Sequence, residues 1–205
     1  MHEMSSTPAP TRPRYDLWTA LIVVDVQNDF ADPAGSLAVV GAPAILPAIE
    51  AEIAAAHAAD ALVVYTQDWH PAVTSHFAKD GGTWPVHCVH ETWGAEFYPG
   101  LTVDGPIVRK GTNGEDGYSG FSMRDPASGE TTPTELADLL RQRNIERAVV
   151  IGLATDYCVR ATAIDAHILG FRTTVVRGAV AAVDLAPGDG DRALAELAAV
   201  GVTLA

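Results

Sequence analysis

The feature that most constrains the fold is an alternation of short aliphatic runs with stretches of helical spacing. Residues 20–26 read ALIVVDV, and a run apolar at nearly every position is typical of a strand buried on both faces of a parallel sheet. The predicted strands are 20–26, 61–67, 106–109, 147–153, 172–176 and 202–204. The predicted helices are 43–59, 134–144, 156–169 and 189–199. Alternating strands and helices predict an α/β protein, with a mainly parallel six-stranded sheet in a three-layer α/β/α sandwich.

The chain is long enough to bury a full core in one domain, with 205 residues. Residues 1–14 are rich in Ser, Thr and Pro, so we expect a flexible N-terminal tail before a single domain at 15–205. The aliphatic runs are far shorter than the roughly 18 apolar residues of a membrane-spanning helix. The N-terminus has no apolar signal segment, and two cysteines do not make a disulfide scaffold. We therefore expect a cytoplasmic protein with no membrane partner.

The charge balance argues against one class of partner. The chain has 26 acidic and 13 basic residues, a formal net charge of −13 with histidine neutral. A chain this acidic is repelled by phosphate backbones, so nucleic-acid binding is not its expected role. The charge does not identify a substrate, and a monomer and a homo-oligomer both stay open.

Chemically reactive side chains stand at the ends of four predicted strands. They are Asp25 after the first, Asp68 and His70 after the second, Lys110 after the third and Cys158 after the fourth. In an open parallel sheet, ligands bind beyond the carboxyl ends of the strands. The sequence therefore predicts that these side chains meet in one site.

Cys158 is a candidate nucleophile. It lies at or near the start of a predicted helix, where unpaired N–H groups and the helix dipole favour a thiolate and can hold an oxyanion. Asp25 is a candidate to accept the thiol proton, and Lys110 to hold both groups in place. The plainer alternatives are a buried structural cysteine, an aspartate that caps a turn with Asn28, and a solvated lysine.

A second group of residues has the composition of a metal site. Asp68 and His70 are two positions apart at a strand end, so their side chains lie on the same side. His76 and His87 follow on a long irregular segment that can fold back. One carboxylate and three imidazoles suit Zn²⁺, Fe²⁺ or Mn²⁺, with positions left open for water or substrate. Unrelated surface histidines are the alternative, and Cys88 is a rival ligand.

Three aromatic residues, Phe30, Trp84 and Tyr118, flank these positions in the sequence. Aromatic side chains of this kind can hold a flat ring between them. Taken singly, each is more typical of an ordinary place in the core than of a substrate contact.

The motifs that contain these residues are, in order, VVDVQNDF (23–30), DWHP (68–71), SHF (75–77), WPVHC (84–88), RKG (109–111), YSGF (118–121) and GLATDYCVRATA (152–163). Together they resemble the nicotinamidase/pyrazinamidase branch of the isochorismatase-like cysteine hydrolases. The resemblance runs from about residue 17 to the C-terminus, and several motifs in the right order make it specific. It implies the isochorismatase-like hydrolase fold.

The resemblance also implies roles for individual residues. Asp25, Lys110 and Cys158 match a catalytic triad. The implied ligands of one divalent metal ion, with zinc favoured over iron and manganese, are Asp68, His70, His76 and His87.

The resemblance further implies a non-proline cis peptide bond between Ala154 and Thr155, which turns the N–H groups of Thr155 and Cys158 toward the oxyanion. Phe30, Trp84 and Tyr118 match positions that line a pyridine pocket. Tyr157, beside the nucleophile, is a further candidate contact for the substrate ring.

The activity that the resemblance implies is hydrolysis of nicotinamide to nicotinate and ammonia through a thioester on Cys158, in NAD salvage, with pyrazinamide as a second substrate. A related hydrolase that acts on a carbamoyl, ureido or isochorismate-type substrate is the alternative. Such enzymes resemble this chain at the triad but not across the full set of four metal ligands. A non-catalytic binding protein on the same fold is disfavoured because all three triad positions are filled.

Overall fold

The computed structural model describes residues 13–205. Its main sheet has the strand order β3-β2-β1-β6-β7-β8, and each neighbouring pair is parallel. The strands are β1 (Thr19–Val24), β2 (Leu62–Asp68), β3 (Ile107–Lys110), β6 (Arg147–Leu153), β7 (Arg172–Ala181) and β8 (Thr203–Leu204). The predicted six-stranded parallel sheet is confirmed, although β7 is longer than the predicted 172–176.

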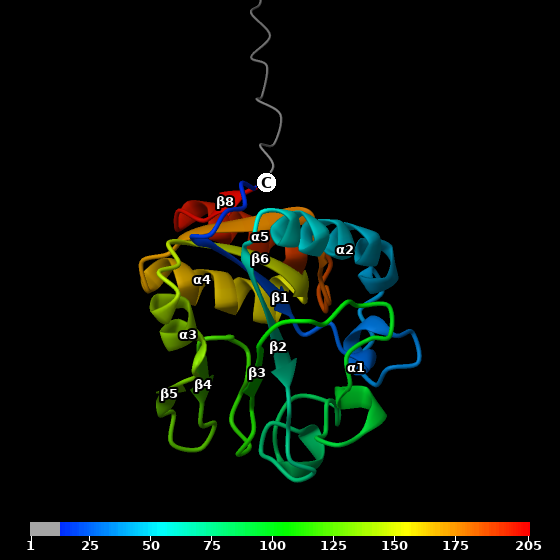
Figure 1. Ribbon diagram of the computed structural model, residues 1–205. Coiled ribbons are helices and arrows are strands. Elements are labelled where there is room, and N and C mark those ends of the chain that lie inside the picture. Colours follow the sequence, from blue (N-terminus) through cyan, green and yellow to red (C-terminus); the bar gives the residue numbers. More distant parts are fainter. Residues whose placement is uncertain (1–12) are drawn as a thin grey trace, which may run out of the picture.

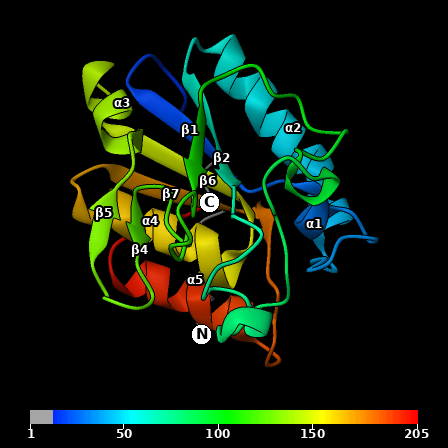
Figure 2. The same ribbon diagram turned by 90° about the horizontal axis from the view of Figure 1, so that it is seen from below.

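Helices cover both faces of the sheet, which confirms the three-layer sandwich. Figure 2 shows α2 (Ala42–Ala58) on one side and α3 (Leu136–Gln142), α4 (Arg160–Ile168) and α5 (Asp189–Ala199) on the other. Alternate residues of β1 pack into two hydrophobic cores, one on each face of the sheet. Leu21 belongs to the core under α2, and Ile22 belongs to the core under α3, α4 and α5. All six residues of β1 are buried, which explains why the whole run is apolar.

Three local features differ from the predictions. The first strand ends at Val24, before the predicted 26, because Asp25 adopts a left-handed φ of 49° that extended backbone cannot accommodate. The predicted helix 156–169 divides into a π-helical turn, η3 (Thr155–Val159), and α4. Short elements without a readable period were missed: α1 (Asn28–Ala31), η1 (Ala78–Asp80), η2 (Trp93–Ala95), β4 (Ser122–Arg124) and β5 (Thr131–Pro133).

The carboxyl ends of β1, β2, β3 and β6 lie at the same edge of the sheet. In Figure 1 the segment 69–97, which contains η1 and η2, and the short helix α1 gather beyond this edge, and residues 98–105 then run back to the start of β3. This arrangement brings the segments that carry the candidate residues to one end of the molecule.

No helix within residues 13–205 combines the length and the apolar character needed to cross a membrane. The predicted tail, residues 1–14, lies outside the described residues except for Pro13 and Arg14. The boundary at residue 15 therefore stays a prediction.

Candidate active site

Asp25 stands directly beyond β1 and is completely buried. Its carboxylate accepts a hydrogen bond at Oδ1 from Thr66 Oγ1 (2.6 Å) and one at Oδ2 from Lys110 Nζ (2.6 Å). Ligand atoms of Asp25, Asp68 and Cys158 all lie within 4.8 Å of one another. The structure thus brings Asp25, Lys110 and Cys158 together from three different strand ends. Thr66, on the neighbouring strand β2, was missed because nothing in a buried threonine of a strand marks it as a partner.

Lys110 is the cation at the centre of this group. Its Nζ lies 2.6 Å from Asp25 Oδ2 and 2.9 Å from Asp68 Oδ1, and it donates to the carbonyl of Gly117. Complete burial acts against the charged ammonium, but the Asp25 and Asp68 carboxylates outweigh it and hold the pKa of Lys110 well above its usual value. Lys110 therefore stays protonated, between two carboxylates that would otherwise repel each other.

Burial sets the protonation of the nucleophile and of its neighbour. It raises the pKa of Asp25 to about 6; Lys110 opposes this rise, and Asp68 adds to it. Burial also raises the pKa of the Cys158 thiol well above its usual value, because its effect is larger than the opposite effect of the Lys110 charge. At neutral pH the structure therefore holds a neutral thiol close to an ionised carboxylate, which is the arrangement that proton transfer to a base requires.

Cys158 lies in the π-helical turn η3, directly after β6. The cis peptide bond joins Leu153 to Ala154, so the predicted position, Ala154–Thr155, is wrong by one residue. Leu153 is the last residue of β6, and the residue types at 152–155 do not mark which of their peptide bonds is cis.

The backbone of this turn leaves donors near the thiol. The N–H groups of Tyr157 and Val159 both donate to the Ala154 carbonyl at 3.1 Å. Within residues 13–205, the N–H groups of Thr155 and Cys158 have no acceptor outside η3. Such N–H groups are the donors that stabilise an oxyanion. Their role here stays a prediction.

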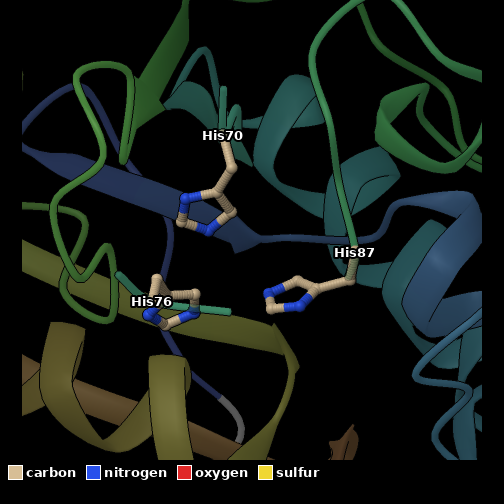
Figure 3. Close-up of side chains that lie close together, drawn as sticks. All are labelled: His70, His76 and His87. Carbon is tan, nitrogen blue, oxygen red and sulfur yellow. The ribbon is translucent and has the colours of Figure 1, made fainter. Parts of the chain in front are cut away.

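Three imidazoles face a common point. Figure 3 shows the rings of His70, His76 and His87 gathered from separate parts of the chain, and a ring nitrogen of each lies within 4.8 Å of the others. Asp68 Oδ2 lies 3.7 Å from His70 Nε2 and 3.9 Å from His87 Nε2. The four predicted ligands thus come together. Cys88 does not join them, because its Sγ lies 3.8 Å from the Gly94 carbonyl.

The histidines fit a metal ion by their hydrogen bonding as well as by their position. His70 is fully buried, yet neither ring nitrogen has a hydrogen-bond partner among the described residues. A buried polar atom without a hydrogen-bond partner lowers the stability of the fold unless a bound ligand contacts it. Burial lowers the pKa of His87 to about 4, which keeps the ring neutral, as a metal ligand must be.

Two further contacts orient the imidazoles. Asp116 Oδ1 lies 2.6 Å from His76 Nδ1, and the Pro85 carbonyl lies 2.8 Å from His87 Nδ1. An Nδ1–H that donates to these oxygens leaves Nε2 with its lone pair free to bind a metal. Asp116 was missed because it lies in a polar, glycine-rich segment in which one more acidic residue is unremarkable.

Gln27 holds Asp68 in place. Its Oε1 accepts the N–H of Asp68 (2.8 Å), and its Nε2 donates to the carbonyl of Asp68 (2.8 Å) and of Ala95 (2.9 Å). Gln27 is fully buried, and both the oxygen and the nitrogen of its side-chain amide form hydrogen bonds with backbone groups. It was also missed, because Gln27 is followed directly by Asn28 and Asp29 and nothing in the sequence distinguishes it from these polar neighbours.

One cavity joins the two groups of residues. Its walls include the four predicted ring contacts, Phe30, Trp84, Tyr118 and Tyr157, together with Cys158, Asp68, His76 and His87. Trp84 Nε1 donates to the Tyr118 hydroxyl (2.7 Å), and the Tyr157 ring meets Trp84 edge-on at 4.9 Å. Leu37 and Val183 complete an aliphatic wall that was not predicted, because apolar side chains carry no signal for a pocket.

Comparison with known proteins places the chain among hydrolases. The family model described as the isochorismatase domain matches residues 19–205. The nicotinamidase/pyrazinamidase of Mycobacterium tuberculosis is 42% identical over 175 residues, which cover 82% of this chain and 86% of the relative.

Two solved structures are also similar. The pyrazinamidase of Pyrococcus horikoshii in complex with zinc has 40% identity and a TM-score of 0.81, with 92% of this chain and 98% of that chain covered. The PnC1 protein of L. infantum in complex with nicotinate has 36% identity and a TM-score of 0.83, with 93% and 94% covered.

Proposed function

The chain belongs to the isochorismatase family, and from this premise we propose that it is a nicotinamidase, which hydrolyses nicotinamide to nicotinate and ammonia. One observation carries the proposal: a single cavity is lined by aromatic rings, by the Cys158 thiol and by three of the four candidate metal ligands. The nicotinate bound by the L. infantum relative and the zinc bound by the P. horikoshii relative support a pyridine substrate and a divalent metal.

The cavity walls position the substrate. Phe30, Trp84, Tyr118 and Tyr157 hold the pyridine ring so that its carboxamide faces Cys158. Asp68, His70, His76 and His87 would hold a divalent ion, with zinc favoured over iron and manganese, and this ion would supply a Lewis-acid contact that orients the pyridine ring.

The first half of the reaction forms a thioester. Asp25 takes the proton of Cys158, and Sγ attacks the carboxamide carbon while the carbonyl electron pair moves onto the oxygen. The N–H groups of Thr155 and Cys158 stabilise this oxyanion. When the carbonyl re-forms, the C–N bond breaks, and the nitrogen leaves as ammonia with the proton that Asp25 returns.

The second half releases nicotinate. Asp25 takes a proton from a water molecule whose oxygen attacks the thioester carbon. The C–S bond then breaks, and Sγ recovers the proton from Asp25. Throughout, Lys110 holds the carboxylate in place through its 2.6 Å contact with Asp25 Oδ2.

This mechanism predicts a loss of activity in acid. Because the pKa of Asp25 is raised to about 6, the carboxylate is ionised above that pH and protonated below it. A protonated Asp25 cannot accept the Cys158 proton, so kcat/KM falls as the pH drops through about 6, by roughly tenfold for each further unit. Initial rates of ammonia release across the acidic and neutral range test this, with circular dichroism to show that the protein stays folded. A rate that is constant through this range contradicts the role of Asp25.

Removal of the metal is expected to weaken substrate positioning. The apo protein should have kcat/KM for nicotinamide lower by about 10²-fold, because the ring is no longer oriented toward Cys158. Metal analysis must confirm that the sample is empty, and reloading with Zn²⁺, Fe²⁺ or Mn²⁺ in turn tests which ion restores the rate. Unchanged kinetics in a verified apo sample would refute the role of the metal.

Ammonia release from nicotinamide by the purified, metal-loaded protein tests the proposed function. Pyrazinamide should serve as a second substrate, and isochorismate, which has no carboxamide, should release no ammonia. Folded, metal-loaded protein that is silent with nicotinamide would overturn the proposal and favour a related hydrolase with a carbamoyl or ureido substrate.

The proposal also places the enzyme in the cytoplasm, in NAD salvage. Within residues 13–205 neither Cys88 nor Cys158 forms a disulfide, and reduced thiols fit that compartment.

A further inference from the structure

Asp29, in the short helix α1, is a buried carboxylate that the mechanism does not use. It is 8% exposed, and both of its oxygens accept backbone hydrogen bonds from other segments. Oδ1 accepts the N–H of Ser36 (3.0 Å), and Oδ2 accepts the N–H of Cys88 (2.7 Å). Its own carbonyl accepts the N–H of Leu37 (3.1 Å). One residue thus joins two segments that lie far apart in the sequence.

Both segments carry parts of the candidate site. Cys88 directly follows His87, whose ring belongs to the imidazole group, and Leu37 lies in the wall of the cavity. Phe30, the next residue after Asp29, lines the same cavity. Asp29 therefore connects an aromatic wall, an aliphatic wall and a metal ligand.

The surroundings leave the carboxylate little freedom. A Cβ on Gly94 would lie 2.0 Å from Asp29 Oδ2, and a Cβ on Gly35 would lie 2.4 Å from the Asp29 carbonyl oxygen. Both contacts are far closer than atoms approach, so glycine is required at both positions. Cys88 has a left-handed φ of 45°, which is uncommon for a residue with a side chain, and its N–H is the group that Asp29 binds.

We propose that Asp29 is a positioning residue that fixes His87 for metal binding and Leu37 for contact with the substrate ring. This inference rests on the proposed function for the identity of the metal site and the pocket. It predicts that the geometry around Asp29 sets the metal affinity, although Asp29 is not itself a ligand.

The Asp29→Asn variant tests this with almost no change in shape. An asparagine amide offers one acceptor oxygen, so its NH₂ group must face either the Ser36 or the Cys88 N–H, and two donors then oppose each other. We expect the affinity for Zn²⁺ to fall by about 10- to 100-fold, the usual effect of losing support behind a metal ligand. Competition with a chromophoric chelator measures this affinity with Zn²⁺ alone, and so without any substrate.

Asp32→Asn is the matched control. Asp32 follows the same helix and accepts one backbone N–H, from Ala34 (2.8 Å) at Oδ1, which an asparagine oxygen can also accept. The control should therefore bind Zn²⁺ like the wild type. Equal Zn²⁺ affinity in Asp29→Asn and Asp32→Asn, in folded samples, would overturn the inference.

Gly94→Ala is the second variant, and it decides the question if Asp29→Asn does not fold. The new methyl group displaces the Asp29 carboxylate but leaves its charge in the protein. The inference expects weaker Zn²⁺ binding and a higher KM for nicotinamide, whereas wild-type values for both would overturn it. Zn²⁺ binding without any hydrolysis by the wild type would count against the proposed function, while the comparison of Zn²⁺ affinities would still decide the role of Asp29.

Discussion

The Cys158→Ala variant is expected to lose nicotinamide hydrolysis, with kcat/KM reduced by a factor on the order of 10⁴ or more. The thiol supplies the bond that replaces the C–N bond of the substrate, and no other side chain on the cavity wall offers an equivalent nucleophile. Ammonia release measures the loss. Direct binding measurements should show that nicotinamide still binds, because the aromatic walls and the metal ligands are unchanged.

The other cysteine provides the control. Cys88 is completely buried, and its Sγ makes a long contact of 3.8 Å with the Gly94 carbonyl, away from the imidazole group. Cys88→Ala should therefore keep most of the activity, at some cost in stability. If Cys158→Ala retained a rate within about tenfold of the wild type, the nucleophile assignment and the thioester mechanism would both be wrong.

The Lys110→Met variant is expected to lose both activity and stability. Methionine matches the length of the lysine side chain but leaves Asp25 and Asp68 buried without their shared cation. Removal of one partner from a buried ion pair typically lowers the free energy of unfolding by about 3–5 kcal/mol. The pKa of Asp25 should also rise further above about 6, since Lys110 is the group that opposes its rise. The carboxylate then becomes a poorer acceptor for the Cys158 proton at neutral pH.

Urea denaturation and ammonia release test the two effects separately. Lys79→Met is the matched control, because Lys79 is an exposed residue that pairs with Asp80 at the surface. Its unfolding free energy and its activity should both stay close to those of the wild type. A Lys110→Met protein as stable as this control would show that the buried cation does not hold the carboxylates together.

Much of the fold was predictable because buried parallel strands leave a strong pattern. The runs at 20–26 and 147–153 are apolar on both faces, and the structure places them side by side as β1 and β6. Elements of three or four residues, such as α1 and the pair β4 and β5, complete no period and could not be recognised.

The candidate site was predictable to the extent that its residues follow strands. Asp25, Lys110 and Cys158 could be placed at one edge from topology alone, and His76 and His87 could be grouped with Asp68 because the long segment that carries them can fold back. Their roles stay predictions.

The supporting residues left little or no trace in the sequence. Gln27 and Asp29 act through contacts with residues between 41 and 68 positions away, and Asp116 acts through the ring of His76, 40 positions away. No local pattern encodes such a contact. The sequence cannot separate these side chains from ordinary polar residues, and the structure is required to find them.

The placement of Asp68 limits how this protein can be redesigned. Its Oδ1 lies 2.9 Å from Lys110 Nζ, while its Oδ2 faces His70 and His87. The two halves of the site are therefore not modular, since one side chain belongs to both. Changing metal preference at Asp68 would also remove support from the lysine. His76 is oriented by Asp116, which does not contact Lys110. A substitution at His76 would therefore leave the contact between Asp68 and Lys110 in place.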